Sequence, residues 1–225
     1  MSNVGFRIYS KITRPSRERV ELLRGLPVAT IDDCMNRLFC LTGLKPFNKV
    51  PMLGTAFTVK VPAGENNLFN RAIDLAEPGD ILVVDGGASL ERALCGSIMI
   101  NHAKSRGLAG FVINGAVRDV DEIAEIDFPV YALGFNPNGP LKNGKGEINV
   151  PVVAGGMAVM PGDVLVGDGD GIVLVRPGDI EDVVEKTKKA VAGEAHVKEM
   201  IRNKSWDRSN FIKILADEGC EIIDD

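Results

Sequence analysis

The sequence has few of the residues that build most metal sites and nucleophilic sites. Only two histidines occur, His102 and His196, and they lie far apart along the chain. Four cysteines are present, and no two of them form a Cys-x-x-Cys pair. These absences argue against a histidine-rich or zinc-type metal site within one chain, and we interpret the cysteines as reduced, mostly buried thiols.

Long apolar runs and a positive net charge are also missing. No segment approaches the roughly 18 to 20 apolar residues of a membrane span. The opening "MSNVGFRIYSKITRPSRERV" lacks the apolar core of a secretory signal. The formal net charge of -5 argues against nonspecific nucleic-acid binding, which needs a basic face. We therefore expect a soluble, cytoplasmic protein that binds neither nucleic acid nor membrane.

Two nucleotide-binding fingerprints are absent as well, the G-x-G-x-x-G motif and the P-loop. The chain has 225 residues, of which 45% are hydrophobic and 25% charged, and this is enough to bury a sizeable core. No stretch has the composition of a linker between folded halves. We therefore expect a single domain over residues 1–225.

The first 45 residues are expected to be mainly helical. Apolar residues recur at helical spacing in "SRERVELLRGL". A second helix is expected in "TIDDCMNRLFCLTGL", with Thr30 as its N-cap and Gly43 as its stop.

Between residues 54 and 134, strand-like and helix-like segments alternate. Strands are expected in "GTAFTVKVPA", "ILVVD", "GFVIN" and "FPVYALG". Helices are expected in "NLFNRAIDLA", "IMINHAKSRG" and "VDEIAEI". This alternation predicts an α/β fold, with parallel strand pairs in a sheet that helices cover.

The segment after residue 135 is rich in glycine and proline and predicts β-hairpins or a small barrel. A long charged helix is expected to follow, in "DIEDVVEKTKKAVAGEAHVKEMIRNKSW". A Pro-Gly-Asp turn that leads into a strand occurs twice, at 78–80 and 161–163. It is either a duplicated element or a common solution for a turn.

The segment "GAVRDVDE" carries the first candidate site. A glycine turn is expected at Gly115, directly after the expected strand "GFVIN". Ligands gather at the carboxyl ends of parallel strands, and Arg118 and Asp119 follow such an end. The planar fork of arginine fits a carboxylate or an enolate oxygen. A single aspartate can hold Mg²⁺ when water and substrate oxygens complete its shell. Alternatively, Asp119 caps the next helix and Arg118 pairs with a surface acid.

The second candidate is the stretch around Gly96. A glycine inside a helix costs about 1 kcal/mol relative to alanine, so we expect a break there and a new helix near Ser97. The amides of Ser97, Ile98 and Met99 could then bind a substrate carboxylate. The alternative is that Gly96 only admits close helix packing.

Three further polar residues are candidates for the site: Asn66, Glu194 and Glu199. Asn66 in "PAGENN" could orient a ligand, although an asparagine there more often forms a turn. Glu194 and Glu199 lie on the expected C-terminal helix, where such residues are usually solvated charges.

From "PGDILVVDGG" to "WDRSNFIKILADEGCEI" the chain resembles the RraA-like family, over roughly residues 20–225. The motif is a glycine, a spacer, Arg-Asp and an acid three residues later, which Gly96, Arg118, Asp119 and Glu122 supply. The family includes regulator of ribonuclease activity A and the class II 4-hydroxy-4-methyl-2-oxoglutarate aldolases, which also decarboxylate oxaloacetate.

The resemblance implies a swivelling β/β/α domain with a helical N-terminal segment and a long C-terminal helix. It also implies homotrimers or hexamers, with the site between subunits. Asp119 would hold Mg²⁺ or Mn²⁺, Arg118 would contact the keto oxygen of pyruvate, and the amides from Gly96 to Met99 would take its carboxylate.

A glutamate from the neighbouring copy would position metal-bound water, either Glu194 or, as the alternative, Glu199. Asn66 matches a family asparagine near the site. Two residues depart from the family pattern, because aldolase members have an aspartate in place of Ser97 and the strand usually ends in Asp-Gly where Asn114-Gly115 stands here.

The resemblance therefore favours a metal-dependent carbon–carbon lyase that acts on a small 2-oxo acid and releases pyruvate through a stabilised enolate. Loss of the aspartate at Ser97 affects aldol cleavage more than decarboxylation, because decarboxylation makes fewer demands on a base. The rival is a non-catalytic regulator that binds a ribonuclease. A phosphohistidine carrier would need a histidine on an exposed glycine-rich turn, which neither His102 nor His196 provides.

Overall fold

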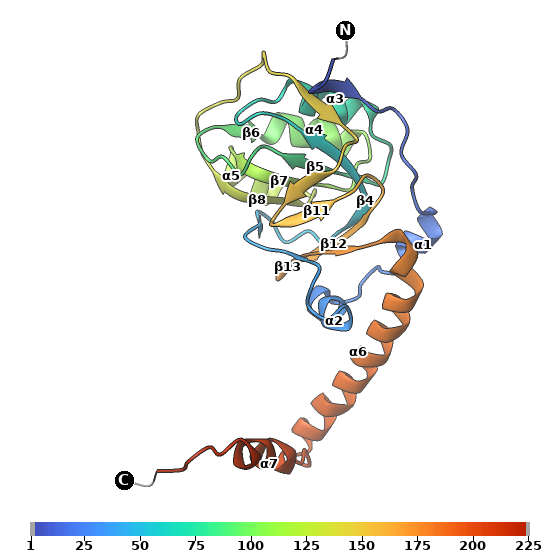
Figure 1. Ribbon diagram of the computed structural model, residues 1–225, viewed down its shortest axis with the longest axis vertical. Coiled ribbons are helices and arrows are strands. Elements are labelled where there is room, and N and C mark those ends of the chain that lie inside the picture. The colour runs from blue at the N-terminus through green and yellow to red at the C-terminus, as the bar shows by residue number, and fades with distance from the viewer. Residues whose placement is uncertain (1–2, 224–225) are drawn as a thin grey trace. The chain divides into compact units, whose positions relative to one another are not determined.

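The computed structural model describes residues 3–223 (Figure 1). The chain divides into two compact units, one that ends at Thr187 and one that begins at Lys188. The expectation of a single domain over residues 1–225 stays a prediction.

The first unit is built on a mixed sheet whose main path runs β2-β13-β12-β4-β5-β7-β8-β3. The four central strands run parallel: β4 (Met52–Lys60), β5 (Asp80–Asp85), β7 (Gly110–Val117) and β8 (Val130–Phe135). All residues of β5 and β7 are buried, because the sheet is covered on both faces. The predicted α/β fold with parallel strands is confirmed.

Shorter strands complete this sheet and a separate two-stranded ribbon. The sheet also contains β1 (Phe6–Ile8), β2 (Cys40–Leu41), β3 (Lys45–Pro46), β6 (Ala93–Cys95), β9 (Gly146–Ile148), β12 (Val164–Asp168) and β13 (Gly171–Val175). The ribbon pairs β10 (Val152–Ala154) with β11 (Met157–Val159). The predicted β-hairpins after residue 135 are present.

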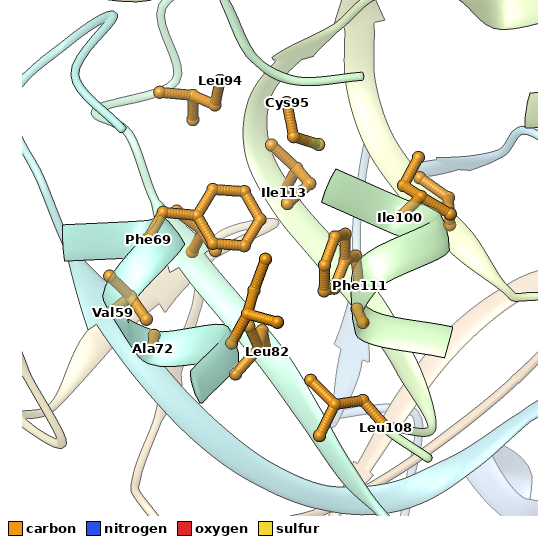
Figure 2. Packing of buried hydrophobic residues seen from close by; sticks show 14 of the residues in the cluster. Val59, Phe69, Ala72, Leu82, Leu94, Cys95, Ile100, Leu108, Phe111 and Ile113 are labelled. Carbon is orange, nitrogen blue, oxygen red and sulfur yellow. The ribbon is translucent and has the colours of Figure 1, made fainter. Parts of the chain in front are cut away.

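Three helices cover one face of the parallel strands: α3 (Asn67–Leu75), α4 (Ser97–Ser105) and α5 (Val120–Glu125). Their apolar sides meet the sheet in the largest core cluster, part of which Figure 2 shows. Within this cluster the rings of Phe69 and Phe128 each contact the ring of Phe111 edge to face, with centroids 5.0 and 5.1 Å from that of Phe111. This packing fixes α3 and α4 against the strands whose carboxyl ends they border.

The N-terminal helices are shorter than the sequence predicts. α1 spans Arg17–Glu21 and α2 spans Val28–Cys34. The prediction of Thr30 as N-cap is wrong, since Thr30 lies inside α2, and Gly43 does not end a helix. Asn36 and Arg37 each have a φ of 60°, in the left-handed region, and this ends the helix. The chain then enters β2, which pairs with β13.

The two Pro-Gly-Asp turns share one structure. The aspartates, Asp80 and Asp163, are buried, and each carboxylate accepts the backbone N–H of the residue three positions earlier, at 2.8 and 2.7 Å. Each also pairs with an arginine, Arg14 in the first turn and Arg176 in the second. The turns lead into β5 and β12, the two strands that flank β4.

A long C-terminal helix is confirmed: α6 spans Ile180–Arg202 after a short 3₁₀ turn (Pro177–Asp179), and α7 follows at Ser209–Asp217. The first turns of α6 pack with α1 and α2 on β12 and β13. Within residues 3–223, no helix is both long and apolar enough to cross a membrane.

Candidate functional site

The strand β7 extends further than the sequence predicts and delivers the candidate residues. The predicted turn at Gly115 is wrong, because β7 continues through Gly115 and Ala116 to Val117. A methyl group on Gly115 would lie 2.9 Å from Leu94 Cδ1, so this glycine lets Leu94 pack on the strand. The chain turns instead at Asp119, two residues after β7 ends, where φ is 63° and ψ is 41°.

The carboxylate of Asp119 caps α4. Asp119 Oδ2 accepts the N–H of Ser97 at 3.0 Å and the hydroxyl of Ser97 at 3.3 Å. A negative charge is favourable at a helix N-terminus, where free amides concentrate. Asp119 stands before α5 but makes no side-chain capping bond to it, so the alternative that it caps the next helix is wrong. The predicted start of α4 at Ser97 is confirmed.

Arg118 lies in a slot between two glycines. A methyl group on Gly96 would overlap Asp119 Oδ2 and lie 3.0 Å from Arg118 Cγ, and one on Gly139 would lie 3.0 Å from Arg118 Nη1. Arg118 Nε is 3.9 Å from Asp119 Oδ1, and the side chains of Arg118 and Asp119 are 42% and 38% exposed. Solvent therefore reaches the pair, and its guanidinium and carboxylate stay available to a ligand.

Arg118 and Asp119 open onto a pocket of about 340 Å³. The motif residue Gly96 and the predicted residues Asn66, Ile98 and Met99 also line it. Ser97 is buried at its edge, through the bond to Asp119. The remaining lining residues are Asn70, Cys95, Gly139, Pro140 and Lys142.

Lys142 is the charged lining residue that the sequence analysis missed. It is exposed and lies in the loop between β8 and β9. Glycine-rich loops carry no periodic pattern, so the sequence gives no sign of which wall such a lysine reaches. With Lys142 and Arg118 against Asp119, the pocket lining has one positive charge in excess, which favours an anionic ligand.

Asn66 joins three elements at the pocket. Its Nδ2 donates to the carbonyl of Leu94 at 3.0 Å and contacts Met99 Sδ at 3.4 Å. Its Oδ1 is buried and has no partner among the described residues. Asn66 therefore ties the start of α3 to β6 and α4, and does more than form a turn.

The first amides of α4 are unequally available. The Ser97 N–H donates to Asp119, and the Met99 N–H donates to the carbonyl of Gly96 at 3.1 Å. The Ile98 amide takes part in neither bond, and the Ile98 side chain is 80% exposed. Carboxylate binding by these amides stays a prediction, and Ile98 offers the one amide of the three that need not exchange such a bond.

The donor set fits a hydrated divalent cation better than a caged one. Among the described residues, no three His, Cys, Asp or Glu side chains are grouped so that they could hold a metal ion. Asp119 offers one carboxylate. Its Oδ1 lies 3.9 Å from Arg118 Nε, which is beyond hydrogen-bond distance. The motif acid Glu122 is exposed on α5 and does not line the pocket. One carboxylate suits Mg²⁺ or Mn²⁺, which complete their shells with water and substrate oxygens.

Cys95 is not a candidate nucleophile, although it lines the pocket. Burial, with a smaller contribution from the charge of Asp119, raises the pKa of the Cys95 thiol far above its usual range. The thiolate is the reactive form, so this cysteine is expected to be unreactive as a nucleophile.

The second predicted catalytic group lies in the other compact unit. Glu194 and its alternative Glu199 are both exposed on α6, and Lys198 Nζ lies 3.6 Å from Glu194 Oε2. A role for either residue at the site of a neighbouring copy stays a prediction.

Asn114, which departs from the family pattern, has a structural place beside the pocket strands. Its Nδ2 donates to Asp85 Oδ1 at 3.3 Å, and its Oδ1 accepts the N–H of Gly155 at 3.4 Å. Asp85 Oδ2 in turn accepts the N–H of Val153 at 3.3 Å. Asn114 and Asp85 thus fasten the β10–β11 ribbon to the middle of β7 and to the end of β5.

We expect Asn114→Asp to lower the free energy of unfolding by about 2 kcal/mol at neutral pH, because two buried carboxylates would then face each other. The loss should shrink as the pH falls and the pair binds a proton. Urea unfolding at neutral and mildly acidic pH measures both effects. Asn143→Asp, at an exposed position, is the control, and an equal loss at both pH values would contradict the expectation.

These features define the class of the protein. The protein is an α/β protein with an anion-accepting pocket at the carboxyl ends of parallel strands, where an arginine and an aspartate meet a helix N-terminus. The RraA-like family model, described as "Aldolase/RraA", matches residues 28–174. The chain belongs to the RraA-like family.

Two similar proteins carry an enzyme name. A "Putative 4-hydroxy-4-methyl-2-oxoglutarate aldolase" of Halalkalibacterium halodurans is 38% identical over 173 residues, which cover 76% of this chain and 82% of that protein. A "Putative 4-hydroxy-4-methyl-2-oxoglutarate aldolase 3" of Arabidopsis thaliana is 43% identical over 123 residues, which cover 55% of this chain and 74% of that protein.

A similar solved structure carries a different name. It is RraAS2 of Streptomyces coelicolor, described as an unusual member of the RNase ES inhibitor RraA protein family. The TM-score is 0.76 at 26% identity, and the match covers 84% of this chain and 99% of that one. Some relatives therefore carry an enzyme name and another carries an inhibitor name. The names alone do not distinguish the two functions, so the function of this chain is argued from its site.

Proposed function

We propose that the protein is a divalent-metal-dependent carbon–carbon lyase that acts on 2-oxo acids and releases pyruvate. Its reaction is of the 4-hydroxy-4-methyl-2-oxoglutarate aldolase type, the oxaloacetate decarboxylase type, or both. The observation that carries the proposal is the pair of Arg118 and Asp119 at the mouth of one pocket, 3.9 Å apart and both solvent-accessible.

The metal is held by Asp119 in this proposal, through the carboxylate oxygen that Ser97 does not use. A bound Mg²⁺ or Mn²⁺ supplies Lewis-acid stabilisation of negative charge on the substrate oxygens. The remaining steps belong to the side chains of the pocket.

Arg118 stabilises the enolate oxygen that forms when the carbon–carbon bond breaks. Its guanidinium donates from a fixed position, so little reorganisation is needed as charge develops. The Ile98 amide and the N-terminus of α4 favour the carboxylate next to the keto group. Lys142, on the loop across the pocket, faces the distal carboxylate of a dicarboxylic substrate.

Ser97 makes decarboxylation the better supported half of the proposal. Its hydroxyl donates to Asp119 Oδ2 at 3.3 Å, and a hydroxyl is not a carboxylate base. Loss of CO₂ leaves an enolate without requiring proton removal from a tertiary alcohol, so a pocket without a second carboxylate can support it.

The assembly is part of the proposal. Homotrimers or hexamers would let Glu194 or Glu199 of one copy approach the pocket of the next and position water there. Light scattering of the purified protein measures the assembly. Loss of activity in a Glu194→Gln variant, with Glu199→Gln as its comparison, tests which glutamate is used.

The wild-type protein should release pyruvate from oxaloacetate in the presence of Mg²⁺ or Mn²⁺, and a chelator should abolish the release. Lactate dehydrogenase coupled to NADH oxidation follows pyruvate directly. 4-Hydroxy-4-methyl-2-oxoglutarate is the second substrate to test. If neither substrate yields pyruvate, or if release survives the chelator, the proposal fails.

Asp119→Asn should weaken Mn²⁺ binding at least about tenfold, because the amide loses the charge that attracts the cation. Asparagine tolerates the left-handed backbone and still offers an oxygen to the Ser97 amide, so the fold should survive. Electron paramagnetic resonance of free Mn²⁺ gives the affinity. Glu122→Gln, an exposed acid outside the pocket, is the matched control and should bind as the wild type does.

The rival function is a regulator that binds a ribonuclease, as the name of the Streptomyces protein suggests for that relative. Exposed apolar residues favour it, among them Ile98 in the pocket lining at 80% exposure and Phe135 at the end of β8 at 67%. A regulator without catalysis should show no pyruvate release and should bind a ribonuclease equally well with and without the metal.

A further inference from the structure

The loop between β8 and β9 forms one wall of the pocket and lies outside the Gly…Arg-Asp motif. It contributes Gly139, Pro140 and Lys142 to the lining. Gly139 faces the guanidinium end of the Arg118 side chain.

Arg92 fastens this loop from one side. Its Nη1 donates to the side-chain oxygen of Asn138 at 3.1 Å and to the carbonyl of Gly139 at 2.9 Å. The N–H of Ala93 donates to the carbonyl of Asn138 at 2.9 Å. The alkyl stem of Arg92 lies against Gly64, where a methyl group would come within 2.9 Å of Cδ.

A second set of backbone bonds fastens the loop next to Asn66. The N–H of Leu141 donates to the carbonyl of Gly64 at 2.8 Å, and the N–H of Asn66 donates to the carbonyl of Leu141 at 3.2 Å. Gly139 is therefore held between two anchored points and cannot move away from Arg118 without breaking hydrogen bonds.

The backbone of Gly139 does not itself require glycine. Its φ lies outside the left-handed region, whereas fourteen other glycines in the described part of the chain have positive φ. A methyl group there would meet one atom within 4 Å, Nη1 of Arg118, at 3.0 Å. The missing side chain thus makes room for the guanidinium of Arg118.

We propose that Gly139 is a positioning residue for Arg118, and that Arg92 makes it effective by fixing the loop that carries it. Gly96 supports the Cγ and Nε end of the arginine, and Gly139 limits the Nη1 end. The slot restricts the orientation of the guanidinium beside Asp119. For catalysis this inference rests on the proposed function, but the positioning itself does not.

The first test measures the environment of the Arg118 side chain in the absence of any substrate. The Nε–Hε resonance of Arg118 is assigned by comparison with Arg118→Lys in ¹H–¹⁵N spectra of the full chain. Gly139→Ala should shift this resonance, and Gly139→Val should shift it further, because a larger group displaces Nη1 more. Gly169→Ala and Gly169→Val are matched controls at a glycine with open space around it and should leave the resonance unchanged.

The second test reads the reaction. Gly139→Val should lower kcat for pyruvate release about tenfold, since a displacement near 1 Å can cost up to about 100-fold in rate. Its effect on Mn²⁺ affinity should be small, because Asp119 does not touch Gly139. Arg92→Met should act in the same direction by freeing the loop, with a midpoint of thermal unfolding close to that of the wild type.

The outcomes distinguish the positioning role of Gly139 from the proposed function. An unshifted Arg118 resonance in both Gly139→Val and Arg92→Met overturns the positioning role, whatever the activity. A shifted resonance supports it even where the wild type releases no pyruvate, in which case only the proposed function has failed. If Gly139→Val does not fold, Gly139→Ala and Arg92→Met give the same readout.

Discussion

Replacing Arg118 with alanine is expected to lower kcat/KM for pyruvate release by about 100- to 1000-fold, the range seen when one donor to a developing oxyanion is removed. The guanidinium lies in the pocket beside Asp119, and within residues 3–223 no other arginine lines that pocket. Among the described residues, Lys142 is the one other cation in the lining, and its flexible stem ends in a point charge rather than a fork.

The same substitution should change stability little. The Arg118 side chain is 42% exposed and lies 3.9 Å from its ionic partner, and such pairs contribute at most about 1 kcal/mol. Coupled assays and urea unfolding are measured together. Arg71→Ala, which breaks an exposed ion pair with Asp74, is the control and should keep full activity. A variant Arg118→Ala with wild-type kinetics would remove the basis for an enzyme.

Replacing Gly96 with alanine is expected to lower kcat/KM by about 1000-fold or more, because it disturbs two groups at once. The new methyl group would overlap Asp119 Oδ2 and press on Arg118 Cγ. Asp119 can retreat only by giving up the N–H of Ser97, so the cap of α4 is lost together with the geometry of the carboxylate.

Loss of that cap should also lower the free energy of unfolding by about 1 to 2 kcal/mol. Gly96 itself has a φ of -146°, which alanine adopts without strain, so the effect is one of space and not of backbone. Gly178→Ala, at a glycine with nothing within 4 Å, is the control. Full activity in Gly96→Ala would contradict the expectation that a methyl group at this position displaces Asp119 and Arg118.

The local rules of helix formation predicted part of this site well. A glycine in a helical pattern marked the start of α4 at Ser97, because an internal glycine is costly and a starting one is not. The alternation of strands and helices predicted the parallel sheet, and the end of a parallel strand predicted the place of Arg118 and Asp119.

The errors arose where distant residues decide the local structure. Gly115 was expected in a turn, yet it continues β7 because Leu94 packs on its bare Cα. The alternative that Asp119 caps its own helix was wrong, because its capping partner is Ser97, 22 residues earlier. Lys142 and Gly139 reach the pocket through a loop whose register depends on Arg92, and no periodicity reveals that.

The cap formed by Asp119 gives this position two separate reasons to persist through evolution. One is the architecture of α4, and the other is the proposed chemistry. A descendant that abandoned catalysis would still be under selection to keep an oxygen at this point, and asparagine would satisfy it. A relative with asparagine at this position would thus be a natural experiment, in which we expect the scaffold to be inherited and the cation affinity to be lost.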